Sequence, residues 1–286
     1  MLRYRQEQKW FKKNSDLSYL KNINPEKALS DPIVPIFIFS AGWRSGSTLL
    51  QRLVLSSEDI LMWGEPFDKS NIVESMSESL IHFSDYWPPK TSYLNEEDVN
   101  YLSDKWVANL YPRLETLKKS HRSFFDTLFN LSTKEKNMRW GVKEVRWGKK
   151  EARYLKWLYP NAKFVFLVRD PYQSYSSFKA IRTSWFARWP IQRVYNPLSF
   201  SRHWNMLVND FVDVYQEVDG VLIKYEDLVG NKLSVLDTIN TYLGIEIDPS
   251  ILKNKIGSTR IQNSLNYVEK LMIKYNVEQN YKKLYV

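Results

Sequence analysis

The chain has 286 residues, 43% of them hydrophobic, and no linker, repeat or low-complexity run divides it, so we expect a single domain over residues 1–286. The absence of cysteine excludes disulfides, zinc–thiolate sites and thiol nucleophiles, and favours a reducing, cytoplasmic location. The net charge of +9 indicates an anionic ligand or surface, but the basic residues are scattered and form no nucleic-acid-binding motif, so we do not expect nucleic acid as a partner.

The N-terminal stretch "MLRYRQEQKWFKKNSDL" is basic, but no apolar run follows it. The longest apolar runs, "PIFIFSA" and "FVFLV", are far shorter than the roughly 20 residues that a membrane span needs. We therefore expect neither a secretion signal nor a membrane span.

The first predicted unit is a strand, a tight loop and a helix. Residues 33–40 are apolar and rich in β-branched and aromatic side chains, as in a buried strand. Residues 47–55 carry apolar side chains at helical spacing, and Ser47 or a neighbour is a plausible N-cap.

Two shorter strand candidates follow, in "DILMWGEPF" and "MRWGVKEVRW". Residues 68–137, between them, are mainly polar, with helical periodicity around 99–117 and 124–131. We expect a helical insertion here, of the kind that shapes a substrate pocket.

The remaining chain repeats the strand and helix order. A helix ending at Leu158 precedes a strand over 164–168 and a helix opened by Pro171. A strand over 221–224 precedes a helix that ends near Gly244, and residues 250–286 form a C-terminal helical segment. This alternation predicts an α/β fold with a P-loop-like parallel sheet that carries helices on both faces.

The loop "AGWRSGST" resembles a nucleotide-kinase phosphate loop that has lost its lysine. Ala41 stands at the first glycine of G-x-x-x-x-G-K-[ST], Ser47 replaces the lysine, and Gly46 and Thr48 keep their positions. The pattern favours a single terminal phosphate on a helix N-terminus without magnesium, with Arg44 as a fixed cation. The alternative is a tight bend with no ligand.

A second anion site is predicted in "FLVRDPYQSYSSF". Arg169 follows a strand directly, and Ser177 lies on the helix after it, so both can face the sheet edge at which ligands of open α/β sheets bind. A local salt bridge or cap involving Arg169 and Asp170 is the alternative.

These motifs together resemble those of the PAPS-dependent sulfotransferases, which use 3′-phosphoadenosine 5′-phosphosulfate. The Arg-Ser-Gly of "RSGSTLL" is similar to the carbohydrate and tyrosylprotein branches. The resemblance implies PAPS as donor, 3′,5′-adenosine bisphosphate as product and no metal. It implies that the 5′-phosphosulfate is bound by Arg44, Ser45, Gly46, Ser47, Thr48 and Leu49, and the 3′-phosphate by Arg169 and Ser177. "VLIKYEDLV" is a third, structural match.

The same resemblance implies catalytic roles. Glu65 of "GEPF" stands where related enzymes place a glutamate base, Lys143 resembles a lysine that contacts the sulfuryl group, and Arg44 is the cation on the leaving side. Alternatively, Glu65 is a cap or ion-pair partner, and "KEVR" is a solvated charge ladder on an edge strand. Glu144 is the reserve base. The three histidines are expected on the surface or in packing, namely His82, His121 and His203.

The expected acceptor is a hydroxyl group, most simply of a carbohydrate or glycan. Aromatic residues in the second half of the chain suit a sugar platform with nearby arginines, or else a core: Trp140, Trp147, Trp185, Phe186, Trp189, Tyr195 and Trp204, with Arg182, Arg188 and Arg193. Ser258 and Arg260 are candidates for a lid over the donor, or for an ordinary loop. The alternatives are a P-loop kinase with Asp170 as magnesium ligand, a non-catalytic anion-binding protein, and sulfation of a protein tyrosine or a small hydroxylated metabolite.

Overall fold

The computed structural model describes residues 15–22, 34–67, 70–81, 114–130, 138–181, 193–230, 233–253 and 264–285. Its centre is a five-stranded sheet in the order β2-β3-β1-β4-β5, in which every paired strand is parallel. The strands are β1 (Ile36–Ser40), β2 (Ile60–Gly64), β3 (Arg139–Glu144), β4 (Lys163–Val168) and β5 (Val221–Lys224).

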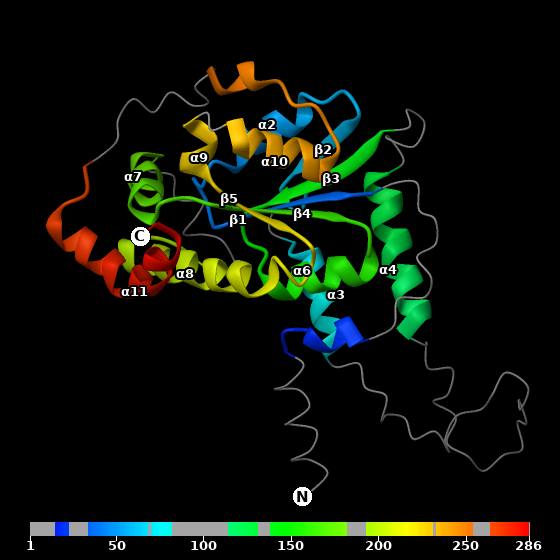
Figure 1. The fold of residues 1–286 in the computed structure, drawn as a ribbon. Coiled ribbons are helices and arrows are strands. Elements are labelled where there is room, and N and C mark those ends of the chain that lie inside the picture. The colour runs from blue at the N-terminus through cyan, green and yellow to red at the C-terminus, as the bar shows by residue number, and fades with distance from the viewer. Residues whose placement is uncertain are drawn as a thin grey trace, which may run out of the picture.

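Helices cover both faces of the sheet (Figure 1). The α-helices are α2 (Ser47–Leu55), α3 (Ile72–Ile81), α4 (Leu114–Phe129), α6 (Lys149–Leu158), α7 (Pro171–Ile181), α8 (Pro197–Val214), α9 (Tyr225–Val229), α10 (Leu233–Leu243) and α11 (Tyr267–Tyr285), and two short 3₁₀ helices are η1 (Ser18–Asn22) and η4 (Pro249–Lys253). Helices α2, α9 and α10 lie over one face, and α3, α6 and α8 over the other. The predicted α/β fold with a P-loop-like parallel sheet is confirmed.

The two faces of the sheet bury different side chains. Alternation along β1 sends Ile36 and Ile38 into an aliphatic cluster with α2 and α10, and sends Phe37 and Phe39 into an aromatic cluster with α6 and α8. Trp140, Trp147 and Trp204 are each about 1% exposed within the aromatic cluster. These three tryptophans are therefore core residues and are not available as a sugar platform.

Some element boundaries differ from the prediction. Strand β1 begins at Ile36, because Pro35 before it has no N–H group to donate to a neighbouring strand. The N-cap of α2 is Gly46, which makes no side-chain capping bond, and Ser47 is the first helical residue.

The insertion is helical where the structure describes it, but its helices are differently placed. Helix α3 was not predicted, and α4 runs unbroken through the gap expected between two shorter helices. His121, in that gap, lies on the side of α4 that faces α6, with Nδ1 2.8 Å from the hydroxyl oxygen of Tyr154. Residues 82–113 and 131–137 lie outside the described part of the chain.

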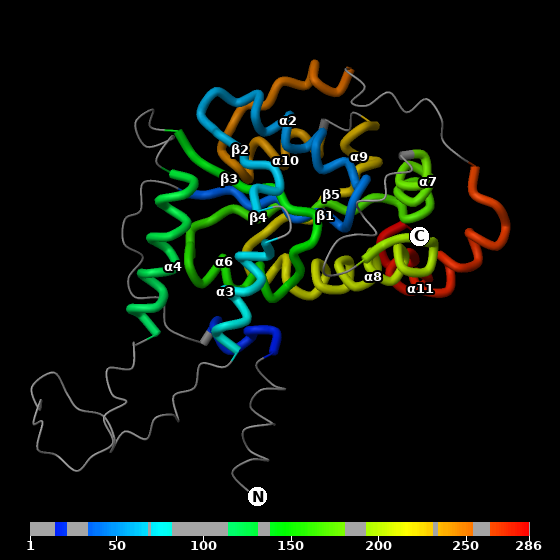
Figure 2. Tube along the Cα trace, turned by 180° about the vertical axis from the view of Figure 1, so that it is seen from behind, coloured from blue at the N-terminus to red at the C-terminus, as the bar shows by residue number. Residues whose placement is uncertain are grey.

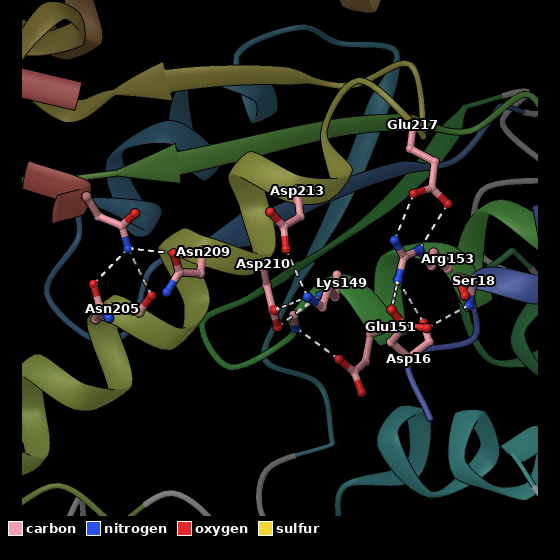
Figure 3. A network of polar contacts seen from close by, with 12 residues as sticks. Asp16, Ser18, Lys149, Glu151, Arg153, Asn205, Asn209, Asp210, Asp213 and Glu217 are labelled. Atoms are coloured by element: carbon pink, nitrogen blue, oxygen red, sulfur yellow. Dashed lines mark hydrogen bonds and ion pairs between the residues drawn. The ribbon is translucent and has the colours of Figure 1, made fainter. Parts of the chain in front are cut away.

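Helix α8, which the sequence pattern alone did not reveal, is joined to α6 by ion pairs (Figure 3). Lys149 contacts Asp213 at 2.9 Å and Asp210 at 3.4 Å, both on α8. Arg153 of α6 contacts Glu217, just after α8, and Asp16, just before η1, each at 2.8 Å. Seen from behind, α4 lies at one end of the molecule and α7 and α11 at the other, where the strands end (Figure 2). No described helix is both long and apolar enough to cross a bilayer.

Candidate active site

The loop between β1 and α2 is held open by left-handed backbone conformations. Gly42, Arg44 and Gly46 have φ values of 82°, 67° and 92°. Inside the loop, the Ser45 hydroxyl donates to the Gly42 carbonyl oxygen at 2.7 Å and lies 2.6 Å from the Ser40 hydroxyl. Such a turn directs successive N–H groups into one concavity, which is suited to an anion.

The other predicted loop ligands differ in exposure. Thr48 is exposed on the first turn of α2, whereas Ser47 and Leu49 are buried. The Ser45 hydroxyl is engaged within the loop, so its side chain shapes the turn, and its N–H group is the part that can face a ligand.

Position 46 has no room for a side chain, because the ring of Tyr225 lies against it. A Cβ atom at this position would lie 2.1 Å from Cδ2 of Tyr225, the first residue of α9. The Tyr225 ring therefore closes one side of the loop. This contact explains part of the "YEDLV" match, because its tyrosine packs directly on the predicted phosphate loop.

Arg44 and Arg169 lie together although they are far apart in the sequence. Arg169 Nη1 donates to the carbonyl oxygen of Arg44 at 3.0 Å, and its guanidinium stacks over the Tyr225 ring at 4.3 Å. Arg44 Nε donates to the hydroxyl oxygen of Ser177 at 3.1 Å. Burial and the nearby Arg169 lower the pKa of Arg44, whereas Tyr225 acts against them.

The positive charges of this arginine pair are not balanced by a nearby carboxylate among the described residues. Neither guanidinium forms an ion pair with a carboxylate in the described part of the chain, and the buried Nε of Arg169 has no hydrogen-bond partner there. The neighbouring Asp170 instead accepts from the backbone N–H of Gln173 at 2.8 Å, at the start of α7. Two adjacent cations without a carboxylate fit the two anionic groups of PAPS.

Glu65 and Lys143 form a second pair at the same edge of the sheet. Glu65 directly follows β2, with φ of 50°, and its N–H donates to the carbonyl oxygen of Lys143 at 2.8 Å. Lys143 Nζ donates to Glu65 Oε1 in an ion pair. The Lys143 side chain is 5% exposed and that of Glu65 is 27% exposed, so the carboxylate is the more accessible partner.

Glu144 and Arg146 point to the opposite face of the sheet. They form an ion pair of 2.8 Å, with Glu144 1% exposed and also accepting from the N–H of Val145 at 2.8 Å. Strand β3 lies between β2 and β1, so the alternative of a solvated ladder on an edge strand is wrong. Both carboxylate oxygens of Glu144 accept hydrogen bonds and the side chain is buried, so Glu65 is the more accessible of the two carboxylates.

The C-terminal helix is tied to the site through Glu226. Its Oε1 accepts from the N–H of Asp170 at 2.9 Å, and its Oε2 accepts from the hydroxyl of Tyr285 on α11 at 3.2 Å. Glu226 therefore connects the end of β4 to the end of the chain. The sequence gives the motif but no signal of this long-range contact.

His203 and Trp43 were not predicted at the site. His203 is buried on α8, with its ring 5.3 Å from that of Trp43 in the loop. Neither ring nitrogen of His203 has a hydrogen-bond partner in the described part, and burial, with a smaller effect of Arg146, lowers its pKa to about 4. The neutral ring of His203 packs against Trp43 of the loop, so the predicted packing role is confirmed.

Several predicted residues cannot be placed. Ser258, Arg260, Arg182, Arg188, Trp185, Phe186, Trp189 and His82 lie outside the described residues. Tyr195 and Arg193 are exposed just before α8. The lid and the remaining aromatic platform therefore stay predictions.

Comparisons with solved structures found sulfotransferases among the similar structures. A sulfotransferase domain from the curacin biosynthetic pathway has a TM-score of 0.48 and 17% identity, over 89% of this chain and 92% of that one. The Alicyclobacillus acidocaldarius sulfotransferase has a TM-score of 0.47 and 14% identity, over 87% and 95%. Mouse sulfotransferase SULT7A1, complexed with PAP, has a TM-score of 0.46 and 12% identity, over 94% and 89%.

A search of curated proteins gave no match. The sequence model described as "Sulfotransferase family" matches residues 35–249, which span all five strands and all three motifs. That match covers most of the chain. The protein therefore belongs to the sulfotransferase family, a family that uses PAPS, and is a sulfotransferase enzyme.

Proposed function

We propose that the protein transfers the sulfuryl group of PAPS to a hydroxyl of a carbohydrate or glycan, by in-line displacement with Glu65 as the base. The observation that carries this proposal is the pair of Arg44 and Arg169, which meet at the sheet edge without a carboxylate partner in the described part. The Glu65 and Lys143 pair lies at the end of the adjoining strands β2 and β3.

The donor supplies an activated sulfuryl group between two phosphate-type anions. The N–H groups of the loop from Arg44 to Thr48 and the start of α2 would hold its 5′ end, and Arg169 with Ser177 would hold its 3′-phosphate. The match to the sulfotransferase family argues against the alternative of a P-loop kinase. Arg44 would stabilise the negative charge that builds on the leaving phosphate, because catalysis of this kind of transfer is mainly electrostatic.

Glu65 would take the proton of the acceptor hydroxyl. Its Oε1 is occupied by Lys143, and the ion pair fixes the direction of its more exposed carboxylate. Lys143 can turn from Glu65 to a sulfuryl oxygen, which would free the carboxylate as charge develops. One lysine would then serve both the base and the transferred group.

The acceptor class rests on two features. The loop has Arg-Ser-Gly and the second strand ends in "GEPF", the combination that resembles carbohydrate and tyrosylprotein enzymes. The core positions of Trp140, Trp147 and Trp204 mean that any stacking on a sugar ring must come from other aromatic residues, of which Tyr195 is exposed. Tyrosine peptides and small hydroxylated metabolites remain the alternatives, and a cytoplasmic location stays a prediction.

Donor binding is tested by titration calorimetry with 3′,5′-adenosine bisphosphate and, separately, ATP with magnesium. We expect the bisphosphate to bind and ATP with magnesium to give little heat. Arg169→Ala should weaken bisphosphate binding at least tenfold, since charge-assisted bonds to phosphate contribute about 1.5–3 kcal/mol. Stronger binding of ATP with magnesium, or indifference to Arg169, would contradict the donor assignment.

The base is tested by transfer from labelled PAPS to a panel of glycans, tyrosine peptides and small alcohols. Glu65→Gln should lower turnover about 100-fold or more, as loss of a general base does, and leave bisphosphate affinity unchanged. Glu144→Gln is the matched control, and we expect it to reduce stability by removing the buried ion pair with Arg146. Full turnover by Glu65→Gln would assign the base elsewhere, and labelling of peptides alone would reject the carbohydrate.

A further inference from the structure

The first half of α11 exposes an unusual number of large apolar side chains. They are 40–83% exposed and, at spacings of one, three and four residues, share one side of the helix: Tyr267, Val268, Leu271, Met272 and Tyr275, which we call the α11 patch. Single exposed apolar residues are ordinary, but a contiguous group marks an interaction surface.

The exposure does not come from a loosely attached helix. The inner side of α11 buries Ile273 and Val277, and Asn280 donates to Oδ1 of Asn205 at 2.7 Å and of Asn209 at 2.9 Å (Figure 3). Nearer the patch, Asn276 donates to the Ser201 hydroxyl at 2.8 Å. The helix therefore has apolar residues on its outer side as well as on the inner side that packs against the protein, unlike the usual surface helix with a polar outer face.

The charges around the patch are basic. Lys270 and Lys274 are exposed on α11 beside it, and Lys283 is exposed further along. The two carboxylates of the helix are already engaged, Glu269 with Lys179 of α7 at 2.8 Å and Glu278 with Lys282 at 3.0 Å. The partner of this surface should be anionic and apolar.

A second copy of the chain fits this requirement poorly. In a two-fold contact the same surface faces itself, so this basic surface would be set against an equally basic one. The patch is also the outer side of a helix, a convex surface that offers no groove to a peptide segment. A lipid layer with anionic headgroups satisfies both the charge and the shape.

We propose that the α11 patch docks the protein on an anionic lipid bilayer. Leu271 and Met272 enter the boundary between headgroups and acyl chains, the tyrosines place their rings at the interface, and the lysines contact lipid phosphates. Because α11 packs against α7, which carries Ser177, docking brings the donor end of the sheet toward the lipid surface. The inference concerns binding and does not depend on the transfer reaction.

The test is co-sedimentation of the full chain with vesicles of phosphatidylcholine, with and without phosphatidylglycerol. We expect binding that requires phosphatidylglycerol and weakens with salt. Lys270→Glu/Lys274→Glu should lower the affinity about thirtyfold or more, because each basic residue near an anionic membrane contributes roughly a factor of five. Leu271→Ser/Tyr275→Ser should lower it about tenfold by removing apolar burial.

Matched controls use exposed residues away from α11: Leu128→Ser for the apolar change, and Lys119→Glu/Lys253→Glu for the charge change. These controls should bind as the wild type does. Equal binding to both kinds of vesicle, or equal losses in the controls, would overturn the proposal. So would a wild-type dimer in sedimentation velocity that becomes a monomer in Leu271→Ser/Tyr275→Ser, because a second copy would then cover the patch.

Discussion

Arg44 adopts a left-handed backbone conformation, with φ of 67°, although it carries a Cβ atom. Such a conformation costs on the order of 1 kcal/mol and persists where the surroundings impose it. Burial and the neighbouring Arg169 also disfavour the charged form of Arg44, as the direction of its pKa shift records. The residue is therefore held in place at a cost to the unliganded protein, which an anion would offset.

Replacing Arg44 with glycine separates these effects. Arg44→Gly relieves the strained φ and the repulsion from Arg169, so the free energy of unfolding without ligand should stay within about 1 kcal/mol of the wild type. Affinity for 3′,5′-adenosine bisphosphate should fall at least tenfold, by loss of a charge-assisted contact. Urea unfolding and calorimetry measure the two quantities.

Arg153→Ala is the control for Arg44→Gly. Arg153 is half-buried on α6 and pairs with Glu217 and Asp16, so its loss should reduce stability by about 2 kcal/mol and leave bisphosphate affinity unchanged. If Arg44→Gly behaves like Arg153→Ala, Arg44 is a structural residue and its assigned role is wrong.

Gly46 gives a second prediction at this scale, with Gly244 as its matched control. Both have positive φ, but a Cβ at Gly46 would strike the Tyr225 ring, whereas one at Gly244 would have no atom within 4 Å. Gly244→Ala should cost only the backbone strain, about 1 kcal/mol. Gly46→Ala should cost more and weaken bisphosphate binding, because displacing Tyr225 also displaces the stacked Arg169. Equal effects in urea unfolding and calorimetry would contradict this account.

At the scale of elements, the sequence predicted the strands and helices that are marked by a local run of apolar residues and a tight turn. The strand and helix around the loop, and the strand before Arg169, have buried apolar runs and tight turns that identify them. Lys143 and Glu144 are adjacent in β3 and lie on opposite faces of the sheet, because strand side chains alternate. Glu65 was expected near the chemistry only through its motif.

The elements that were missed depend on contacts between distant segments. Helix α8 is amphipathic, yet its place depends on core packing of residues such as Phe211 and on the ion pair of Asp213 with Lys149 of α6, which no sequence spacing reveals. The contact of Tyr285 with Glu226 spans 59 residues. His203 carries no motif, and only its burial against Trp43 brings it to the site. Tertiary packing, not propensity, decides such positions.

The attachment of α11 to α8 yields a prediction for a whole element. Asn280 is 3% exposed, and its amide nitrogen donates to side-chain oxygens of Asn205 and Asn209. Asn280→Ala should lower the free energy of unfolding by about 1–3 kcal/mol, because it removes the hydrogen bonds that the buried amide donates. Gln279→Ala, at an exposed position, should change it by less than about 0.5 kcal/mol. Urea denaturation distinguishes the two; similar values would mean that α11 contributes little to the fold.

At the scale of the molecule, the sheet order assembles the site. Strand β1 lies between β3 and β4, so the loop after β1 has Lys143 on one side and Arg169 on the other. Residues that are more than 120 positions apart, Arg44 and Arg169, thereby meet. This parallel arrangement sets every strand end at one edge, where ligands of open α/β sheets bind. The motifs work together because of topology, not because of proximity in sequence.

Two groups, the half-buried Glu74 on α3 and the buried His203 on α8, give stability opposite dependences on pH. Burial raises the pKa of Glu74 from 4.5 to about 7, helped by Glu151, so the native state holds a proton that the unfolded chain releases, and stability falls as pH rises from 4.5 to 7. Burial lowers the pKa of His203 from 6.5 to about 4, so stability falls as pH drops from 6.5 to 4. Between 4.5 and 6.5 the two slopes oppose each other.

Removing one of the two groups should therefore reveal the pH dependence of stability that comes from the other. Glu74→Gln should match the wild type near pH 4 and exceed it above pH 7 by on the order of 2 kcal/mol, which leaves a net rise with pH between 4.5 and 6.5 from His203. Glu115→Gln, at an exposed position on α4, should follow the wild-type curve throughout. Urea unfolding at closely spaced pH values measures all three. A Glu74→Gln curve parallel to the wild type would show that Glu74 is ionised in the native state at neutral pH, because only a group whose pKa differs between the native and unfolded states can make stability depend on pH.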